Sequence, residues 1–220
     1  MASSRAPQAR ALYVYCIVRA GAPLRLDVAG LDERSPVYAI ELQDLAAVVS
    51  EVPSGTRDPS RANLLAHERV NGAVLRERTV IPMSFGTVFR SRADVEELLR
   101  SAHDTFADVL EKLHDKFEFG LKVSLRPEHG GEADEARAQQ QVDEVLQRLR
   151  DVCVASRCSP TIGDRMILNA AFLVERRREA AFDQRVQAIA AEHDELTFRY
   201  TGPWPPYNFV AIRLKREPVA

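Results

Sequence analysis

The chain has few of the residues from which common catalytic and metal sites are built. Its three cysteines, Cys16, Cys153 and Cys158, form no CxxC pair and have no histidine at metal-ligand spacing, which argues against a zinc site and a disulfide framework. We expect free, buried thiols. The glycine patterns of dinucleotide and phosphate loops, the HExxH and GxSxG motifs and acidic clusters with metal-ligand spacing are also missing. We therefore predict that the protein is not an enzyme and holds no cofactor or metal.

Long apolar runs and a charge excess of either sign are missing as well. Thirty basic and thirty-two acidic side chains leave a formal net charge of −2, so we predict no nucleic-acid partner, while a local patch stays open. No run of about eighteen apolar residues occurs, and the first ten residues contain no apolar h-region. We expect residues 1–11 to be a short disordered lead, the protein to be cytoplasmic, and no membrane to be a partner.

The first half of the chain indicates an α+β domain over residues 12–116. Residues 12–18 are rich in β-branched and aromatic side chains and apolar on both parities, as expected of a strand that is buried on two faces. Pro82 and Gly86 interrupt a later apolar strand, while a 3.6-residue apolar period follows the capping-box sequence at Ser91. In chain order we predict a strand at 12–18, a hairpin at 36–49, a helix at 58–78, an interrupted strand at 79–89 and a helix from 91 to 113.

The second half indicates another α+β domain over residues 117–216. Its predicted order of strand, helix, strand, helix, strand, strand favours a modified ferredoxin-like sandwich, with helices on one face of a mainly antiparallel sheet. The fold class is therefore α+β with two domains. The predicted elements are a strand at 117–125, a helix at 133–155, a strand at 166–174, a helix that opens with the charged residues 175–179, and strands at 196–200 and 210–214.

Two stiff segments that combine proline with aromatic residues have no explanation in an ordinary core. The only tryptophan of the chain lies in the second segment, between prolines that fix the backbone in advance. We interpret both segments as recognition surfaces, and Trp204 as either a partner-binding anchor or a corner residue that packs the turn before the last strand. The candidate residues are Pro82, Phe85, Gly86 and Phe89 in the first segment, and Trp204, Pro205, Pro206, Tyr207 and Phe209 in the second.

Two histidines allow a different hypothesis, a hydrolase or transferase. His67 lies beside Glu68 in a predicted helix, and His193 ends the apolar face of a later one. Histidine titrates near neutral pH and serves as a general base. No nucleophile or second base lies at a spacing that would place it alongside either imidazole. We therefore expect both histidines to be core residues.

At the two stiff segments the sequence resembles the GvpL/GvpF family of gas vesicle proteins. The similarity rests on Tyr13-Val14-Tyr15 with Ile17-Val18, on Ile81-Pro82-Met83 with residues 85–89, and on the run Gly202-Pro203-Trp204-Pro205-Pro206-Tyr207 with Phe209. It extends from residue 12 to residue 214. Ser84 stands where the family often has a basic residue, and Cys16 stands where a glycine is common.

The resemblance implies a two-domain protein with a ferredoxin-like C-terminal domain and no enzymatic activity or cofactor. It implies a role in assembling the gas-filled protein shell, at the gas vesicle, with the apolar shell subunit and other gas vesicle accessory proteins as partners. A different class of function also stays open, because ferredoxin-like sheets serve as small-molecule-binding regulatory modules. A ligand-dependent shift in melting temperature would distinguish that alternative.

Overall fold

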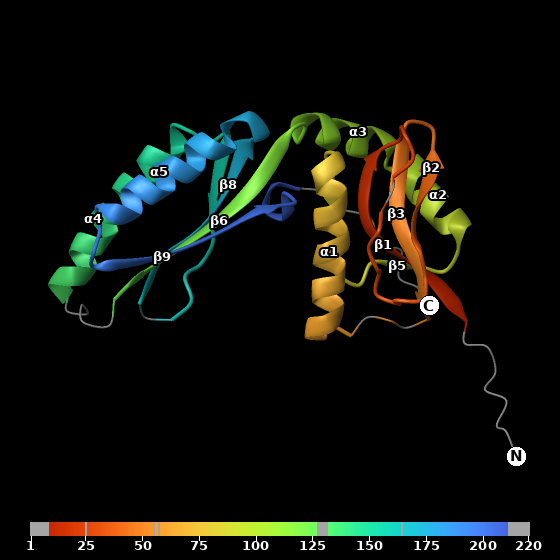
Figure 1. Ribbon diagram of the computed structural model, residues 1–220, viewed down its shortest axis with the longest axis horizontal. Coiled ribbons are helices and arrows are strands. Elements are labelled where there is room, and N and C mark those ends of the chain that lie inside the picture. Colours follow the sequence, from red (N-terminus) through yellow and green to blue (C-terminus); the bar gives the residue numbers. More distant parts are fainter. Residues whose placement is uncertain are drawn as a thin grey trace, which may run out of the picture. The chain divides into compact units, whose positions relative to one another are not determined.

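The computed structural model describes residues 9–24, 26–54, 56, 58–126, 132–163 and 165–210, with only the backbone described at 132–136, 138 and 139. These residues form two compact units, which divide between His114 and Asp115 (Figure 1). Unit 1 holds the described residues up to His114 together with Val210, and unit 2 holds those of 115–209. Each unit contains one antiparallel sheet with its own helices. None of the described helices is long and apolar enough to cross a membrane.

Strand β1 lies inside the sheet of unit 1, whose order is β2-β3-β1-β4, with β5 also paired to β1. Every residue from Ala11 to Val18 is buried, which confirms the prediction of a strand covered on both faces. Figure 1 shows α1 on one side of the sheet and α2 on the other. The strands are β1 (Arg10–Arg19), β2 (Val37–Leu42), β3 (Leu45–Pro53), β4 (Ile81–Pro82) and β5 (Val88–Phe89), and the helices are α1 (Arg61–Glu77), α2 (Arg92–Ser101) and α3 (His103–Lys112).

Several predicted features of unit 1 are present and three need correction. The helix predicted from residue 58 begins at Arg61, with Ser60 as its N-cap. The hairpin is confirmed as β2 and β3, and the capping box of Ser91 with Asp94 begins α2. The predicted disordered lead, residues 1–11, extends too far, because Arg10 and Ala11 belong to β1. The single helix predicted over 91–113 is two helices that meet at Ala102, where φ is −111° and ψ is 16°. An unbroken apolar period does not reveal such a break, since both halves keep the same buried stripe.

Unit 2 has the element order β6, α4, β7, β8, α5, β9 and the sheet order β7-β8-β6-β9. Helices α4 and α5 lie on the same face of this sheet (Figure 1). A short helix, η1, leads into α5, and another, η2, follows β9. The bounds are β6 (Lys116–Leu125), α4 (Glu132–Arg150), β7 (Ala155–Cys158), β8 (Met166–Glu175), η1 (Arg176–Arg178), α5 (Glu179–Ala191), β9 (Leu196–Trp204) and η2 (Tyr207–Phe209).

The predicted elements of unit 2 differ from the structure at two places. Helix α4 ends at Arg150, five residues early, and the strand β7 that follows was not predicted at all. The last predicted strand, 210–214, lies outside the described residues except for Val210, which is not in a strand. Strand β9 instead continues through Gly202 and Pro203 to Trp204. It accommodates the proline because β9 lies at the edge of the sheet.

An aromatic cluster forms the core of unit 2 between the sheet and α5. Phe182 of α5 lies 5.6 Å from Phe119, 5.4 Å from Phe172 and 6.1 Å from Tyr200, measured between ring centroids. The odd-numbered residues of β6 from Phe117 to Leu125 are buried. They therefore face the helices, and the even-numbered residues face the opposite side of the sheet.

Gly202 is the tightest backbone position of β9, and its replacement by alanine is expected to destabilise the protein by about 2–4 kcal/mol. Its φ is +133°, and an added Cβ would lie 2.7 Å from Cδ1 of Phe119 and 3.0 Å from the carbonyl oxygen of Glu118. Urea denaturation followed by circular dichroism measures the effect. In contrast, Gly72→Ala in α1 meets no atom within 4 Å and should stabilise by about 0.5–1 kcal/mol. Equal effects of the two substitutions would contradict the expectation.

Candidate functional site

The first stiff segment, residues 80–89, is fixed to strand β1 along its length. Its two short strands, β4 and β5, both pair with β1. Between them, the Met83 N–H donates to the Tyr15 carbonyl at 2.9 Å, and the Thr87 carbonyl accepts from the Val14 N–H at 2.9 Å. Pro82 is buried in β4. This segment is therefore part of the sheet rather than a separate loop.

The turn between β4 and β5 closes over the hydroxyl of Tyr13. The Gly86 N–H donates to that hydroxyl at 3.1 Å, and the φ of +82° at Gly86 favours glycine. The Phe85 ring lies 5.9 Å from the Tyr13 ring and 5.8 Å from the His67 imidazole. Phe85, Gly86 and Phe89 are each half-buried. Only part of each is exposed, so the segment mainly encloses the core of unit 1.

His67 is the centre of this buried cluster. Its Nδ1 lies 2.9 Å from the Tyr13 hydroxyl, and its Nε2 lies 3.0 Å from the Asn71 side-chain nitrogen. Burial lowers the pKa of His67 to about 4, against a smaller opposing effect of a hydrogen bond with the Met83 backbone. The imidazole is therefore neutral at pH 7. Burial also raises the pKa of Tyr13, so the hydroxyl beside the imidazole stays protonated.

His193 belongs to unit 2 and has different surroundings. Its Nδ1 lies 3.5 Å from the Glu195 carboxylate, and its ring stacks on Phe198 at a centroid distance of 6.3 Å. Like His67, it is buried. Both imidazoles pack inside the core of their own unit, as we expected of core histidines.

The second stiff segment presents two aromatic side chains to solvent. Trp204, at the end of β9, is 39% exposed, and Tyr207, at the start of η2, is 37% exposed. The residues between them, Pro205 and Pro206, are buried. Trp204 pairs with Glu118 in the ladder between β9 and β6. The indole is therefore positioned by strand pairing while more than a third of the residue stays accessible.

A buried carboxylate holds the end of this segment against the sheet. Glu118 of β6 is 5% exposed, and it accepts hydrogen bonds from the Asn208 backbone N–H at 2.7 Å and from the Asn208 side-chain amide at 2.6 Å. Burial raises the pKa of Glu118, and the bonds from Asn208 and the charge of Arg157 oppose that rise. The Arg157 guanidinium also lies over the Phe209 ring at 5.7 Å.

The sequence interpretation missed the groups that hold both segments. In the sequence pattern Tyr13 is one more member of an apolar strand, and Glu118 is one member of an alternating strand. In each case the signal is a polar group in a stretch whose neighbours are all buried, because such a group needs a hydrogen-bond partner inside the protein. The partners themselves, Gly86, His67 and Asn208, are far away in sequence, so spacing could not identify them.

The three cysteines differ in exposure, which corrects the prediction of buried thiols. Cys16 is buried and burial raises the pKa of its thiol, whereas Cys153 is half-buried and Cys158 is exposed on the edge strand β7. All three are free. No group of three histidine, cysteine or acidic side chains within the described part of the chain is placed to hold a metal ion.

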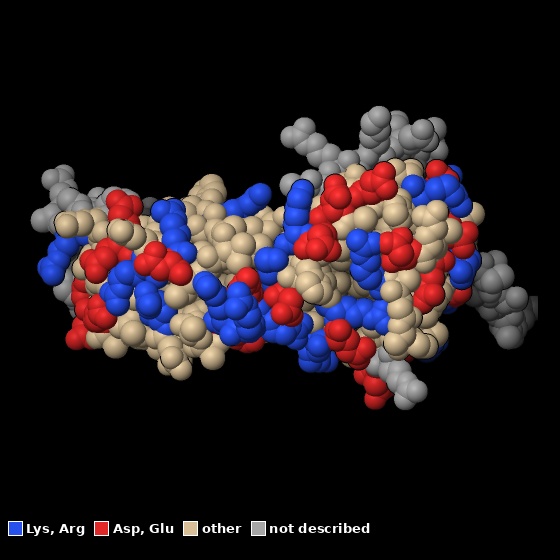
Figure 2. Space-filling view, turned by 90° about the horizontal axis from the view of Figure 1, so that it is seen from above, with Lys and Arg blue, Asp and Glu red and all other residues tan. Residues whose placement is uncertain are grey.

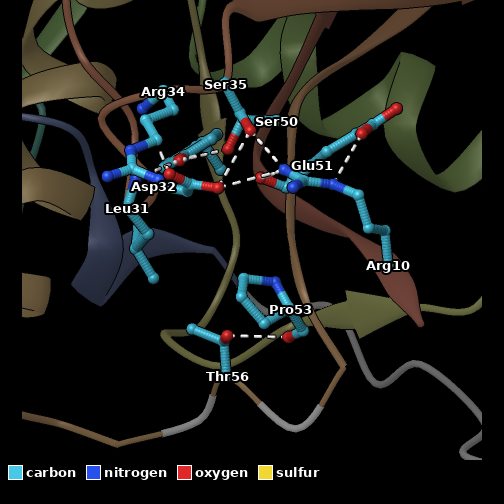
Figure 3. A network of polar contacts seen from close by, with 10 residues as sticks. Arg10, Leu31, Asp32, Arg34, Ser35, Ser50, Glu51, Pro53 and Thr56 are labelled. Carbon is cyan, nitrogen blue, oxygen red and sulfur yellow. Dashed lines mark hydrogen bonds and ion pairs between the residues drawn. The ribbon is translucent and has the colours of Figure 1, made fainter. Parts of the chain in front are cut away.

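Unit 1 also has an open cavity of about 720 Å³ with a polar lining (Figure 3). Arg10 bridges its two sides, with Nη2 at 3.0 Å from Asp32 Oδ2 and Nε at 2.7 Å from Glu51 Oε2. It also donates to the Ser35 hydroxyl. Because Arg10 is already engaged by two carboxylates and a hydroxyl, the network joins β1, β3 and the loop of residues 31–36 rather than offering a free cation to a ligand.

Comparisons with known proteins show the class to which this fold belongs. A model of the family described as "Gas vesicle synthesis protein GvpL/GvpF" matches residues 11–134 and 128–211. Gas vesicle protein F1 of Halobacterium salinarum is 36% identical over 94% of this chain and 95% of its own, and gas vesicle protein F of Haloferax mediterranei is 32% identical over 92% and 94%. Gas vesicle protein L of a Streptomyces species is 29% identical over 92% and 94%.

A solved structure agrees with these relatives. The crystal structure of gas vesicle protein GvpF from Anabaena superposes with a TM-score of 0.86 at 25% identity, over 94% of this chain and 99% of that one. The class is thus that of the gas vesicle proteins. Within it, this chain belongs to the GvpL/GvpF family.

Neutral His67 makes the stability of unit 1 depend on pH. Because its pKa is about 4 in the folded protein, against 6.5 for a solvated histidine side chain, the unfolded chain binds the proton more readily between these values. The contribution of His67 to the free energy of unfolding is complete above pH 6.5 and is lost as pH falls towards 4. The total loss is about 3 kcal/mol. We expect the stability difference between wild type and His67→Gln to shrink as urea unfolding is moved from about pH 7 to about pH 4.5.

His103 provides a control with the opposite sign. The carboxylates of Asp104 and Asp44 raise the pKa of this half-buried side chain, so its contribution to the free energy of unfolding is present at low pH and is lost as pH rises through the raised pKa. A His67→Gln effect that grew on acidification, as the His103→Gln effect should, would contradict the neutral assignment.

The bonds from Asn208 to Glu118 should contribute measurably to unit 2. Asn208→Ala removes the side-chain donor and leaves a buried carboxylate oxygen without it, which is expected to cost about 1–3 kcal/mol. Equilibrium unfolding in urea at neutral pH measures the loss. Asn208→Asp should cost more than Asn208→Ala, because it places a second carboxylate beside the first. The reverse order would show that Glu118 does not hold the segment.

Proposed function

We propose that this protein is a non-enzymatic accessory or minor structural component of gas vesicle assembly. In this proposal it works in the cytoplasm and at the gas vesicle, where it binds the apolar shell subunit and other gas vesicle proteins. Family membership supports the setting. The observation that carries the binding role is the pair of exposed aromatic residues, Trp204 and Tyr207, on a segment that strand pairing and the Glu118–Asn208 bonds hold in place.

The aromatic pair has the properties of a protein-binding anchor. Rigid aromatic side chains bury a large area while losing little conformational entropy, and they dominate binding energies at interfaces. Pro205, Pro206 and Phe209 would support the anchors by fixing the backbone between them. The residues of the first segment, Pro82, Phe85, Gly86 and Phe89, would contribute a smaller, half-buried surface of unit 1, since most of their contacts are internal.

The apolar character of the proposed partner explains why an aromatic anchor would be useful. A shell subunit that is apolar and forms strand-rich layers exposes surfaces that associate prematurely before assembly. An accessory protein that covers part of this apolar surface reversibly would delay that association. Aromatic anchors with polar edges suit reversible binding, because the indole N–H and the phenol hydroxyl keep contact with water.

We also assign unit 2 to the ferredoxin-like class, and the two units to two domains over about residues 12–116 and 117–216. The element order β6, α4, β7, β8, α5, β9 is the βαββαβ order of that class. Two helices on one face of an antiparallel sheet with order β7-β8-β6-β9 fit it as well. This assignment leaves one face of the sheet without helices.

The double variant Trp204→Ala/Tyr207→Ala is expected to weaken capture of the purified shell subunit by about tenfold or more, because anchors of this type contribute most of an interface's binding energy. A pull-down with the full-length chain measures the capture, and circular dichroism checks that the fold is intact. The matched control is Val154→Ala/Ile162→Ala, which removes two other exposed apolar side chains of unit 2. Equal capture by all three proteins would refute the anchor role.

A further inference from the structure

The helix-free face of the sheet in unit 2 carries two cations in direct opposition. Lys122 of β6 and Arg199 of β9 are paired in the antiparallel ladder, so their Cβ atoms are about 5 Å apart. Both side chains are exposed. Among the residues that the structure describes, neither has an ion-pair partner. Like charges placed directly opposite on neighbouring strands destabilise a sheet, so this arrangement is not explained by the folding of the domain.

The ladder positions next to this pair hold no acidic residue. On the same face, Arg157 of β7 is a third cation, whose charge acts on the buried Glu118. The other acidic residue of this face, Glu175, is paired with Arg177 and Arg178. In contrast, Lys and Arg are interspersed with Asp and Glu over the side of the molecule shown in Figure 2. The positions next to the pair in the ladders are Gly120, Ser124, Thr197, Thr201 and Asn169.

We propose that this face docks an acidic segment of a partner protein, with a carboxylate seated between Lys122 and Arg199. One carboxylate can accept charge-assisted hydrogen bonds from an ammonium and a guanidinium together, which removes the repulsion between them. The hydroxyls of Ser124 and Thr197 supply further donors at the rim.

A protein segment fits this face better than a nucleic acid. Sheets of this architecture that bind RNA stack the bases on aromatic side chains of the open face. The ladder positions around Lys122 and Arg199 hold no aromatic residue, and Phe198 and Tyr200 of β9 contact His193 and Phe182 respectively on the helix side. Lys122 and Arg199 are therefore placed for a carboxylate with no stacking platform at the neighbouring ladder positions. The aromatic residues of this face lie further along it, at Trp204 opposite Glu118 and at Phe209 beside Arg157. This inference does not depend on the proposed role in gas vesicle assembly.

Fluorescence anisotropy with a labelled oligo-glutamate peptide of about ten residues tests the proposal on the full chain. In about 0.05 M salt the wild type should bind the peptide, and Lys122→Glu/Arg199→Glu should weaken binding by about tenfold or more. The control Arg90→Glu/Lys112→Glu makes the same change in net charge at exposed positions of unit 1 and should leave the affinity within about twofold. Absent binding to the wild type, or an equal loss in both double variants, would overturn the proposal.

Two further measurements separate the alternatives. Oligouridylate of about ten nucleotides should bind less tightly than the peptide. If it bound more tightly, and Lys122→Glu/Arg199→Glu abolished that binding, the partner of this face would be a nucleic acid and the proposal would be wrong. Lys122→Glu alone converts the repulsive pair into an attractive one, so the melting temperature should rise by about 1 °C or more while peptide binding falls. Arg199→Lys, which keeps both charges, should leave the melting temperature unchanged. An unchanged melting temperature in Lys122→Glu would contradict the repulsion on which the docking face rests.

Discussion

A buried polar side chain on an interior strand of each sheet must find a hydrogen-bond partner, and a stiff segment far away in sequence provides it in both units. In unit 1 the Tyr13 hydroxyl of β1 meets His67 and the N–H of Gly86. In unit 2 the Glu118 carboxylate of β6 meets both donors of Asn208. An unsatisfied group at either place would lose its hydration without compensation. The unusual local sequences therefore have a structural reason that precedes any role in recognition.

Although both segments meet this requirement, they differ in how much aromatic surface they leave exposed. The turn around Phe85 and Gly86 folds over the core and shows little of its aromatic surface. The stretch from Trp204 to Tyr207 is fastened at both ends, by the β9 pairing and by Asn208, so its aromatic side chains stay outside. The two segments are thus similar in composition but differ in role. The first mainly stabilises the core of unit 1, and the second exposes aromatic surface to solvent.

Much of the fold could be predicted from local pattern, and the failures have physical causes. Strand β1 was recognisable because burial on two faces removes polar residues at both parities, and the Ser91 capping box marks the start of α2. Strand β7 has only four residues, Ala155–Cys158, too few to establish a period of two. Its place in the sheet comes from pairing with β8. Polar pairs such as Glu118 with Asn208, ninety residues apart, lie beyond any local pattern.

The one tryptophan of the chain also makes unit 2 optically distinct. Trp204 belongs to that unit and is partly open to water. Its fluorescence therefore reports on the edge of β9 and does not report on the core of unit 1. Circular dichroism, in contrast, records the helices and strands of both units. Whether the two signals change together during denaturation therefore distinguishes one cooperative transition from two, with no label added to the protein.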